Sequence, residues 1–129
     1  MALGYKDLLD QADAEVRSVT VDEAQALANS PDVVLVDIRD PRELEREGLI
    51  PGARHAPRGM LEFWIDPQSP YHKSWFAEDK LFVFYCASGW RSLLATQIAQ
   101  AMGLTCASMR GGFGDWKRAG MPVETRDAR

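Results

Sequence analysis

Two short runs of consecutive apolar residues constrain most strongly how this chain can fold. They are Val33-Val34-Leu35-Val36 and Leu81-Phe82-Val83-Phe84-Tyr85. Neither run alternates with polar residues, which is typical of a β-strand that is covered on both faces. Helical patterns lie between and after these runs, so we predict an α/β fold with a mostly parallel sheet and helices on both faces.

The remaining periodicity places helices and shorter strands around these runs. We expect helices at about 4–16, 21–28, 41–47, 91–102 and 115–118, and short strands near 54–56 and 104–109. Thr20 and Glu23 form the capping-box pattern that opens the second helix. Residues 63–80 combine aromatic residues with prolines, which predicts a long ordered loop with one or two helical turns.

Length and composition exclude several classes of function. A chain of 129 residues with a net charge of −4 predicts one domain, 1–129, and no nucleic-acid partner. No apolar segment approaches the ~20 residues that span a bilayer, so we expect a cytoplasmic protein without a membrane partner. Cys86 and Cys106 form no CxxC pair and no Cys/His cluster. We therefore expect no disulfide, no metal and no cofactor.

Cys86 is the strongest candidate for chemistry because it follows the second apolar run directly. The turn 87–90 comes next, and a helix is expected to open at Arg91. The strand fixes the sulfur, the turn can aim backbone N–H groups at it, and the helix presents its positive end. These features favour a thiolate nucleophile that needs no histidine base. Cys106 lies inside an expected strand and is predicted to be a packed hydrophobe.

The segment Cys86-Ala87-Ser88-Gly89-Trp90-Arg91 resembles the active-site loop of rhodanese domains, which are sulfurtransferases. Two further segments agree with this resemblance: Val36-Asp37-Ile38-Arg39 with Glu43 and 48–53, and Gly111-Gly112-Phe113-Gly114-Asp115-Trp116. Their order and spacing match a single rhodanese domain over about 17–124, preceded by the helix at 4–16. The resemblance implies a five-stranded α/β fold.

The resemblance also implies a persulfide mechanism. Cys86 would take sulfane sulfur from thiosulfate or a persulfide donor, and cyanide, a thiol or a protein acceptor would remove it. Backbone N–H groups of residues 87–91 would hold the persulfide. Gly89 would let the loop curl, and Trp90 would wall the pocket or gate donor size. Arg91 would bind the anionic end of the donor or brace the loop.

Three residues outside the loop are expected to support it or border it. Asp37 and Arg39 are interpreted as supports for the loop rather than reacting groups. Arg58 could line the entrance of the pocket, although a surface position is favoured. Two departures from the family pattern concern charge. Leu49 replaces a histidine that the family often carries, and the loop lacks the basic residues of strongly thiosulfate-active members.

Two other functions compete with sulfur transfer. Phosphatases and arsenate reductases with a related cysteine loop use a Cys-x5-Arg motif, whereas this chain has Cys-x4-Arg. The shorter loop suits a single sulfur atom better than a phosphate. The other alternative is a rhodanese-like binding or redox-sensing module without catalysis. The aromatic-rich segment 59–76 is expected to cover the core, and it would offer such a module a lid or a partner surface.

Overall fold

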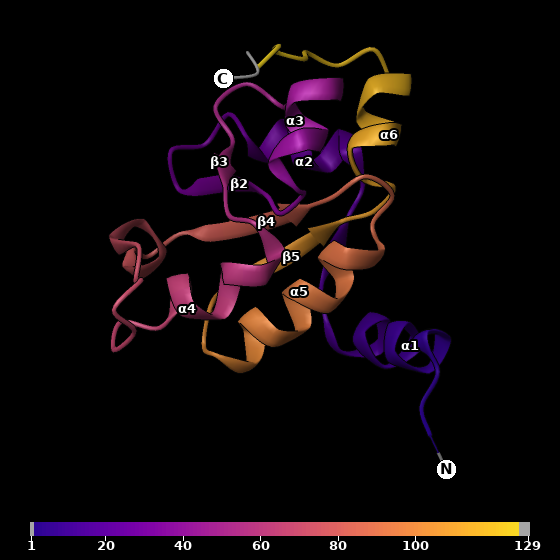
Figure 1. Ribbon diagram of the computed structural model, residues 1–129. Coiled ribbons are helices and arrows are strands. Elements are labelled where there is room, and N and C mark those ends of the chain that lie inside the picture. Colours follow the sequence, from indigo (N-terminus) through magenta and orange to yellow (C-terminus); the bar gives the residue numbers. More distant parts are fainter. Residues whose placement is uncertain (1, 127–129) are drawn as a thin grey trace.

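The computed structural model describes residues 2–126 and is built on a five-stranded sheet (Figure 1). Its strands lie in the order β1-β5-β4-β2-β3, and all four neighbouring pairs are parallel. The predicted α/β class is confirmed. Met1 and residues 127–129, which the expected domain included, lie outside the described residues. The strands are β1 Ser18–Val19, β2 Val33–Asp37, β3 Arg54–His55, β4 Leu81–Tyr85 and β5 Cys106–Met109.

Helices cover both faces of the sheet, as expected for parallel strands joined by crossovers (Figure 1). α2, α3 and α6 lie on one side, and α4 and α5 lie on the other. The helices are α1 Tyr5–Glu15, α2 Val21–Leu27, α3 Pro41–Glu47, α4 Leu61–Ile65, α5 Trp90–Ala101 and α6 Gly112–Arg118, with 3-10 helices η1 Arg58–Met60 and η2 Ser74–Ala77.

The central strand β4 explains why its apolar run is unbroken. Phe82 and Phe84 pack into the core on the α4 and α5 side, whereas Val83 and Tyr85 pack into the core on the α2 and α6 side. Successive side chains of a strand point to opposite faces. Because both faces are buried, every position of the strand must be apolar, and the strand holds the residue that follows it rigidly.

α1 precedes the sheet and packs on α5. Gln97 Nε2 donates to Glu15 Oε2 at 2.8 Å, and Gln100 Nε2 donates to the Glu15 carbonyl at 3.1 Å. Ala12 is fully buried in α1. No helix between residues 2 and 126 combines the length and the hydropathy that crossing a bilayer requires.

The structure differs from the sequence-based expectations at three places. β1 has no counterpart among the expected strands, because two residues are too few to show a period, and it forms only by pairing with β5. The last helix begins at Gly112 rather than near 115. The irregular stretch begins with α4 at Leu61 and contains η2. Its buried residues Leu61, Ile65 and Phe76 join the core, so this segment covers the core as expected.

Candidate active site

Cys86 lies where β4 ends and α5 is about to begin. In the sheet, Tyr85 is opposite Asp37, and the Ile38 N–H donates to the Tyr85 carbonyl at 3.0 Å. The carboxyl ends of β2 and β4 therefore meet at one edge of the sheet, as the sequence predicts. In parallel sheets this edge is where ligands bind.

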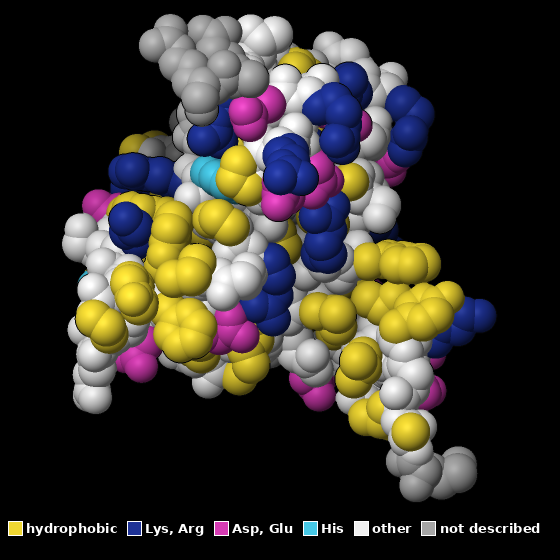
Figure 2. All heavy atoms as spheres, in the orientation of Figure 1, with side chains coloured by type: hydrophobic (Ala, Val, Ile, Leu, Met, Phe, Trp, Pro, Cys, Tyr) yellow, Lys and Arg dark blue, Asp and Glu magenta, His cyan; other side chains and the backbone are white. Residues whose placement is uncertain are grey.

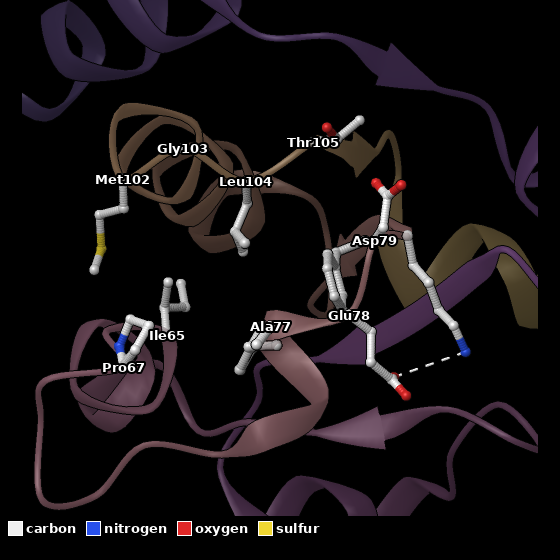
Figure 3. A pocket seen from close by; sticks show the side chains of 12 residues that line it. Ile65, Pro67, Ala77, Glu78, Asp79, Met102, Gly103, Leu104 and Thr105 are labelled. Carbon is white, nitrogen blue, oxygen red and sulfur yellow. Dashed lines mark ion pairs between the residues drawn. The ribbon is translucent and has the colours of Figure 1, made fainter.

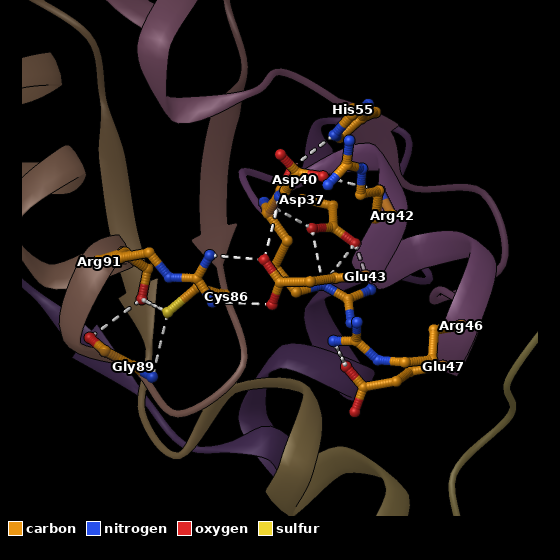
Figure 4. A network of polar contacts seen from close by, with 12 residues as sticks. Asp37, Asp40, Arg42, Glu43, Arg46, Glu47, His55, Cys86, Gly89 and Arg91 are labelled. Carbon is orange, nitrogen blue, oxygen red and sulfur yellow. Dashed lines mark hydrogen bonds and ion pairs between the residues drawn. The ribbon is translucent and has the colours of Figure 1, made fainter.

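The loop after Cys86 folds back over the sulfur (Figure 4). The Gly89 N–H donates to Cys86 Sγ at 3.2 Å. Gly89 has a φ of +106°, a value that L side chains rarely adopt, so glycine permits this reversal. The sequence predicts that backbone N–H groups of residues 87–91 surround the sulfur, but within the described chain only that of Gly89 donates to it. Cys86 is only 1% exposed, so its sulfur lies beneath the loop.

Two buried hydroxyl groups lie under the same loop. Ser92 Oγ lies 3.7 Å from Cys86 Sγ and donates to the Gly89 carbonyl at 3.2 Å. It also lies 3.0 Å from Ser108 Oγ, which belongs to β5. These contacts fix the loop from below. Neither serine is among the site residues predicted from the sequence, although a polar residue on the buried side of α5 is a signal that could have indicated Ser92.

Arg91 is held by a residue from a different helix (Figure 4). Its Nη1 and Nη2 donate to the two carboxylate oxygens of Glu43 at 2.7 and 3.0 Å. Glu43 belongs to α3, and the hydrogen bond from Arg91 lowers the pKa of its carboxyl group. Of the two roles considered for Arg91, this geometry supplies the bracing one. The sequence motif contains Glu43 but gives it no role of its own.

Asp37 and Arg39 form a buried ion pair beside the loop. Arg39 Nε and Nη2 donate to the Asp37 carboxylate, with a shortest distance of 2.7 Å, and Nη2 also donates to the Gly48 carbonyl at 2.8 Å. Nη1 makes no hydrogen bond within the described chain, but the guanidinium lies 4.2 Å from the ring centre of Phe113. The pair therefore joins β2, the turn at Gly48 and α6. Support of the loop 86–91 by this pair stays a prediction.

α6 approaches the loop very closely. The Phe113 N–H donates to the Cys86 carbonyl at 2.8 Å, and the Gly114 N–H donates to the Ala87 carbonyl at 3.0 Å. A Cβ atom at Gly112 would lie 2.6 Å from the Cys86 carbonyl oxygen. This contact requires glycine at position 112, the first residue of α6.

The remaining candidates lie farther out. Trp90 is 59% exposed, and its ring centre lies 5.5 Å from that of Tyr5 in α1. Trp90 and Ser88 border a hollow of about 200 Å³ beside the loop, which Arg110 also lines. The side chain of Arg58 is partly buried, and it donates to Glu62 of α4 at 2.8 Å.

A larger hollow, of about 410 Å³, lies at the opposite edge of the sheet (Figure 3). It borders Phe82 near the start of β4 and Thr105 just before β5. Phe82 and Cys86 are separated by about 13 Å of extended strand. This hollow has no cysteine or histidine in its lining. Its size therefore does not identify it as the reactive site. The candidate active site is instead the end of the sheet where Cys86 lies.

Sequence comparisons relate the chain to sulfur-transferring proteins. Residues 20–119 match the family model of the rhodanese-like domain. A sulfurtransferase from Allochromatium vinosum is 36% identical over 101 residues, which cover 78% of this chain and 86% of that protein. A human protein named thiosulfate:glutathione sulfurtransferase is 32% identical over 106 residues, with coverages of 77% and 91%.

Structural comparisons agree on the fold. The human single-domain sulfurtransferase superposes with a TM-score of 0.67 at 29% identity, covering 78% of this chain and 95% of its own. A protein of unknown function from Rhodopseudomonas palustris, described as a possible tyrosine phosphatase, superposes with a TM-score of 0.93. That protein is 56% identical to this chain, and the match covers 96% of each.

Proposed function

This chain belongs to the rhodanese-like domain family, and we propose that it transfers sulfane sulfur through a persulfide on Cys86. Relatives named as sulfurtransferases support transferase activity of the rhodanese type in general. The position of the sulfur is the observation that supports a persulfide on Cys86. Cys86 Sγ accepts the Gly89 N–H at 3.2 Å, just before the first turn of the 12-residue helix α5. Both features stabilise negative charge on sulfur.

In the first step, the Cys86 thiolate attacks the outer sulfur of the donor. A new S–S bond forms to Cys86, and the bond between the outer sulfur and the rest of the donor breaks. With thiosulfate, the electron pair of that bond leaves on sulfite. With an organic persulfide, it leaves on a thiolate. Covalent catalysis of this kind divides one difficult transfer into two easier ones.

In the second step, a nucleophilic acceptor attacks the outer sulfur of the Cys86 persulfide. The Cys86 thiolate is the leaving group, so the protein returns to its starting state. Cyanide becomes thiocyanate in this step, and a thiol becomes a persulfide. The name of the human relative includes glutathione, which supports a low-molecular-weight thiol as the acceptor.

The surrounding residues have separate roles in this proposal. Gly89 donates to the sulfur, and Arg91 braces the loop against α3. Asp37 and Arg39 position the loop through the Gly48 turn and α6. Trp90 borders the hollow beside the loop, where its exposed ring can contact a donor or an acceptor.

Single-cysteine variants test this proposal. We expect wild-type protein to move sulfur from thiosulfate or an organic persulfide to cyanide, measured as thiocyanate, and Cys86→Ala to lose this activity. Cys106→Ala is the matched control, because burial in β5 raises the pKa of Cys106 to about 11 and keeps its thiol neutral. Activity that survives Cys86→Ala contradicts the mechanism. A wild-type protein that accepts sulfur from no donor favours the binding module.

A phosphatase is the second candidate, because the relative with 56% identity is described as a possible tyrosine phosphatase. The short loop argues against it: only four residues separate Cys86 from Arg91, and both guanidinium donors engage Glu43. Hydrolysis of an aryl phosphate decides between the two functions. Turnover that Cys86→Ser abolishes, in a protein that transfers no sulfur, would establish the phosphatase.

A further inference from the structure

Arg91 is the only charged residue in the loop 86–91, and the carboxylate of Glu43 balances its charge. Each of its two terminal nitrogens donates to a different oxygen of Glu43, at 2.7 and 3.0 Å. This two-point geometry is the strongest form of a guanidinium–carboxylate contact. A substrate anion that seeks the Arg91 guanidinium therefore meets the carboxylate of Glu43 as well (Figure 4).

A second ion pair near the loop is also balanced. Arg39 is fully buried and pairs with Asp37 at 2.7 Å. Glu43 remains ionised at neutral pH, because the hydrogen bond from Arg91 lowers its pKa. The four residues between Cys86 and Arg91 carry no charge. The two ion pairs and the loop thus contribute no net positive charge to attract an anionic donor.

We propose that Glu43 is a specificity-determining residue: by holding Arg91, it disfavours dianionic sulfane donors and favours donors with one negative charge or none, such as organic persulfides. The inference rests on the sulfurtransferase activity proposed above. Its physical basis is that Coulomb energy scales with the charge of the donor. A carboxylate beside Arg91 opposes a dianion twice as strongly as it opposes a monoanion.

Glu43→Gln removes the charge and keeps one of the two acceptor oxygens, so one of the two hydrogen bonds from Arg91 is lost. Glu43 closes the capping box of α3, in which the Asp40 N–H donates to Glu43 Oε1 at 3.1 Å. Glutamine keeps an oxygen that can accept this bond and a bond from Arg91. Glu47→Gln is the matched control. Glu47 lies one turn farther along α3 and pairs with Arg46.

The test compares two donors that release their outer sulfur in the same way. Thiosulfate is a dianion that releases sulfite, and toluenethiosulfonate is a monoanion that releases a sulfinate. We expect Glu43→Gln to raise kcat/KM about tenfold for thiosulfate and about threefold for the thiosulfonate. The ratio between the donors should therefore rise about threefold, and the rise should shrink with added salt. Glu47→Gln should leave the ratio close to that of wild type.

Three results would overturn the inference or its premise. A ratio that Glu43→Gln leaves unchanged, including an equal loss with both donors, would show that Glu43 only positions the loop. If Glu47→Gln raised the ratio of kcat/KM between the two donors equally, the effect would come from the net charge of the protein and not from the position of Glu43. If wild-type protein transfers sulfur from neither donor and from no organic persulfide, the proposed function fails and this inference fails with it.

Discussion

At the scale of single residues, one ion pair links the reactive loop to a helix that is distant in the sequence. Arg91 and Glu43 are 48 positions apart, and their contact forms only when α3 docks beside the start of α5. The side chain of Arg91 is 42% exposed and that of Glu43 is 18% exposed. Solvent therefore screens the pair in part, which keeps its contribution to stability small.

The same pair makes stability depend on pH. Because Arg91 lowers the pKa of Glu43 in the folded protein, the stabilisation is complete above the unfolded value of about 4.3 and is lost as pH falls through the lower folded value. We expect wild type to exceed Glu43→Gln in free energy of unfolding by up to about 1 kcal/mol at pH 7. Urea unfolding should show this difference shrink as pH falls below about 4. A difference that is independent of pH would contradict the electrostatic account.

At the scale of elements, α6 holds the loop in place through backbone contacts. The Phe113 and Gly114 N–H groups donate to the Cys86 and Ala87 carbonyls. Gly112, which begins α6, has a φ of +60° and no room for a side chain on the loop side. The reactive loop is thus clamped between the end of β4 and the start of α6.

Gly112→Ala should break this clamp. A Cβ atom would lie 2.6 Å from one loop carbonyl and 2.7 Å from the next. The left-handed conformation alone costs an L residue about 1–2 kcal/mol, and we expect the clash to bring the loss of stability to about 3 kcal/mol or more. Sulfur transfer should fall as well.

Gly120→Ala is the control that separates the cost of the left-handed backbone conformation from the cost of the steric clash. Gly120 also has a positive φ, of +74°, but a Cβ atom at this position would meet nothing within 4 Å. Denaturant unfolding should therefore show a loss of only about 1–2 kcal/mol. Equal losses of unfolding free energy in Gly112→Ala and Gly120→Ala would show that the close approach of α6 to the loop does not contribute to stability.

The elements that could be predicted from the sequence are those with long or periodic patterns. The unbroken run of β4 requires burial on both faces, and the glycine turn after Cys86 requires a reversal, so both were predictable. The contact between Arg91 and Glu43 was not, because it depends on how α3 docks. Ser92 and Ser108 meet only after α5 packs on β5, and the two residues of β1 carry no pattern. Contacts that form only when helices and strands pack together leave no signal in the local sequence.

At the scale of the whole molecule, the parallel sheet gathers the reactive residues at one edge. Asp37 ends β2 and Cys86 follows the neighbouring strand β4, whereas the hollow of about 410 Å³ lies at the other edge. Figure 2 shows basic and acidic side chains interspersed around α3, and apolar side chains gathered over α4 and around α1 and the start of α5. Trp90 and Tyr5, both more than half exposed, contact each other across α1 and α5. The surface in this view therefore has mixed charge around α3 and apolar groups around α1 and the start of α5.

The mass of the protein after treatment with a sulfur donor tests the central claim most directly. Wild type and Cys106→Ala, incubated with thiosulfate or an organic persulfide, should each gain the mass of one sulfur atom. Peptide mapping should place it on Cys86, and cyanide should remove it. Cys86→Ala should gain nothing. A sulfur atom found on Cys106, or no adduct from any donor, would contradict the account.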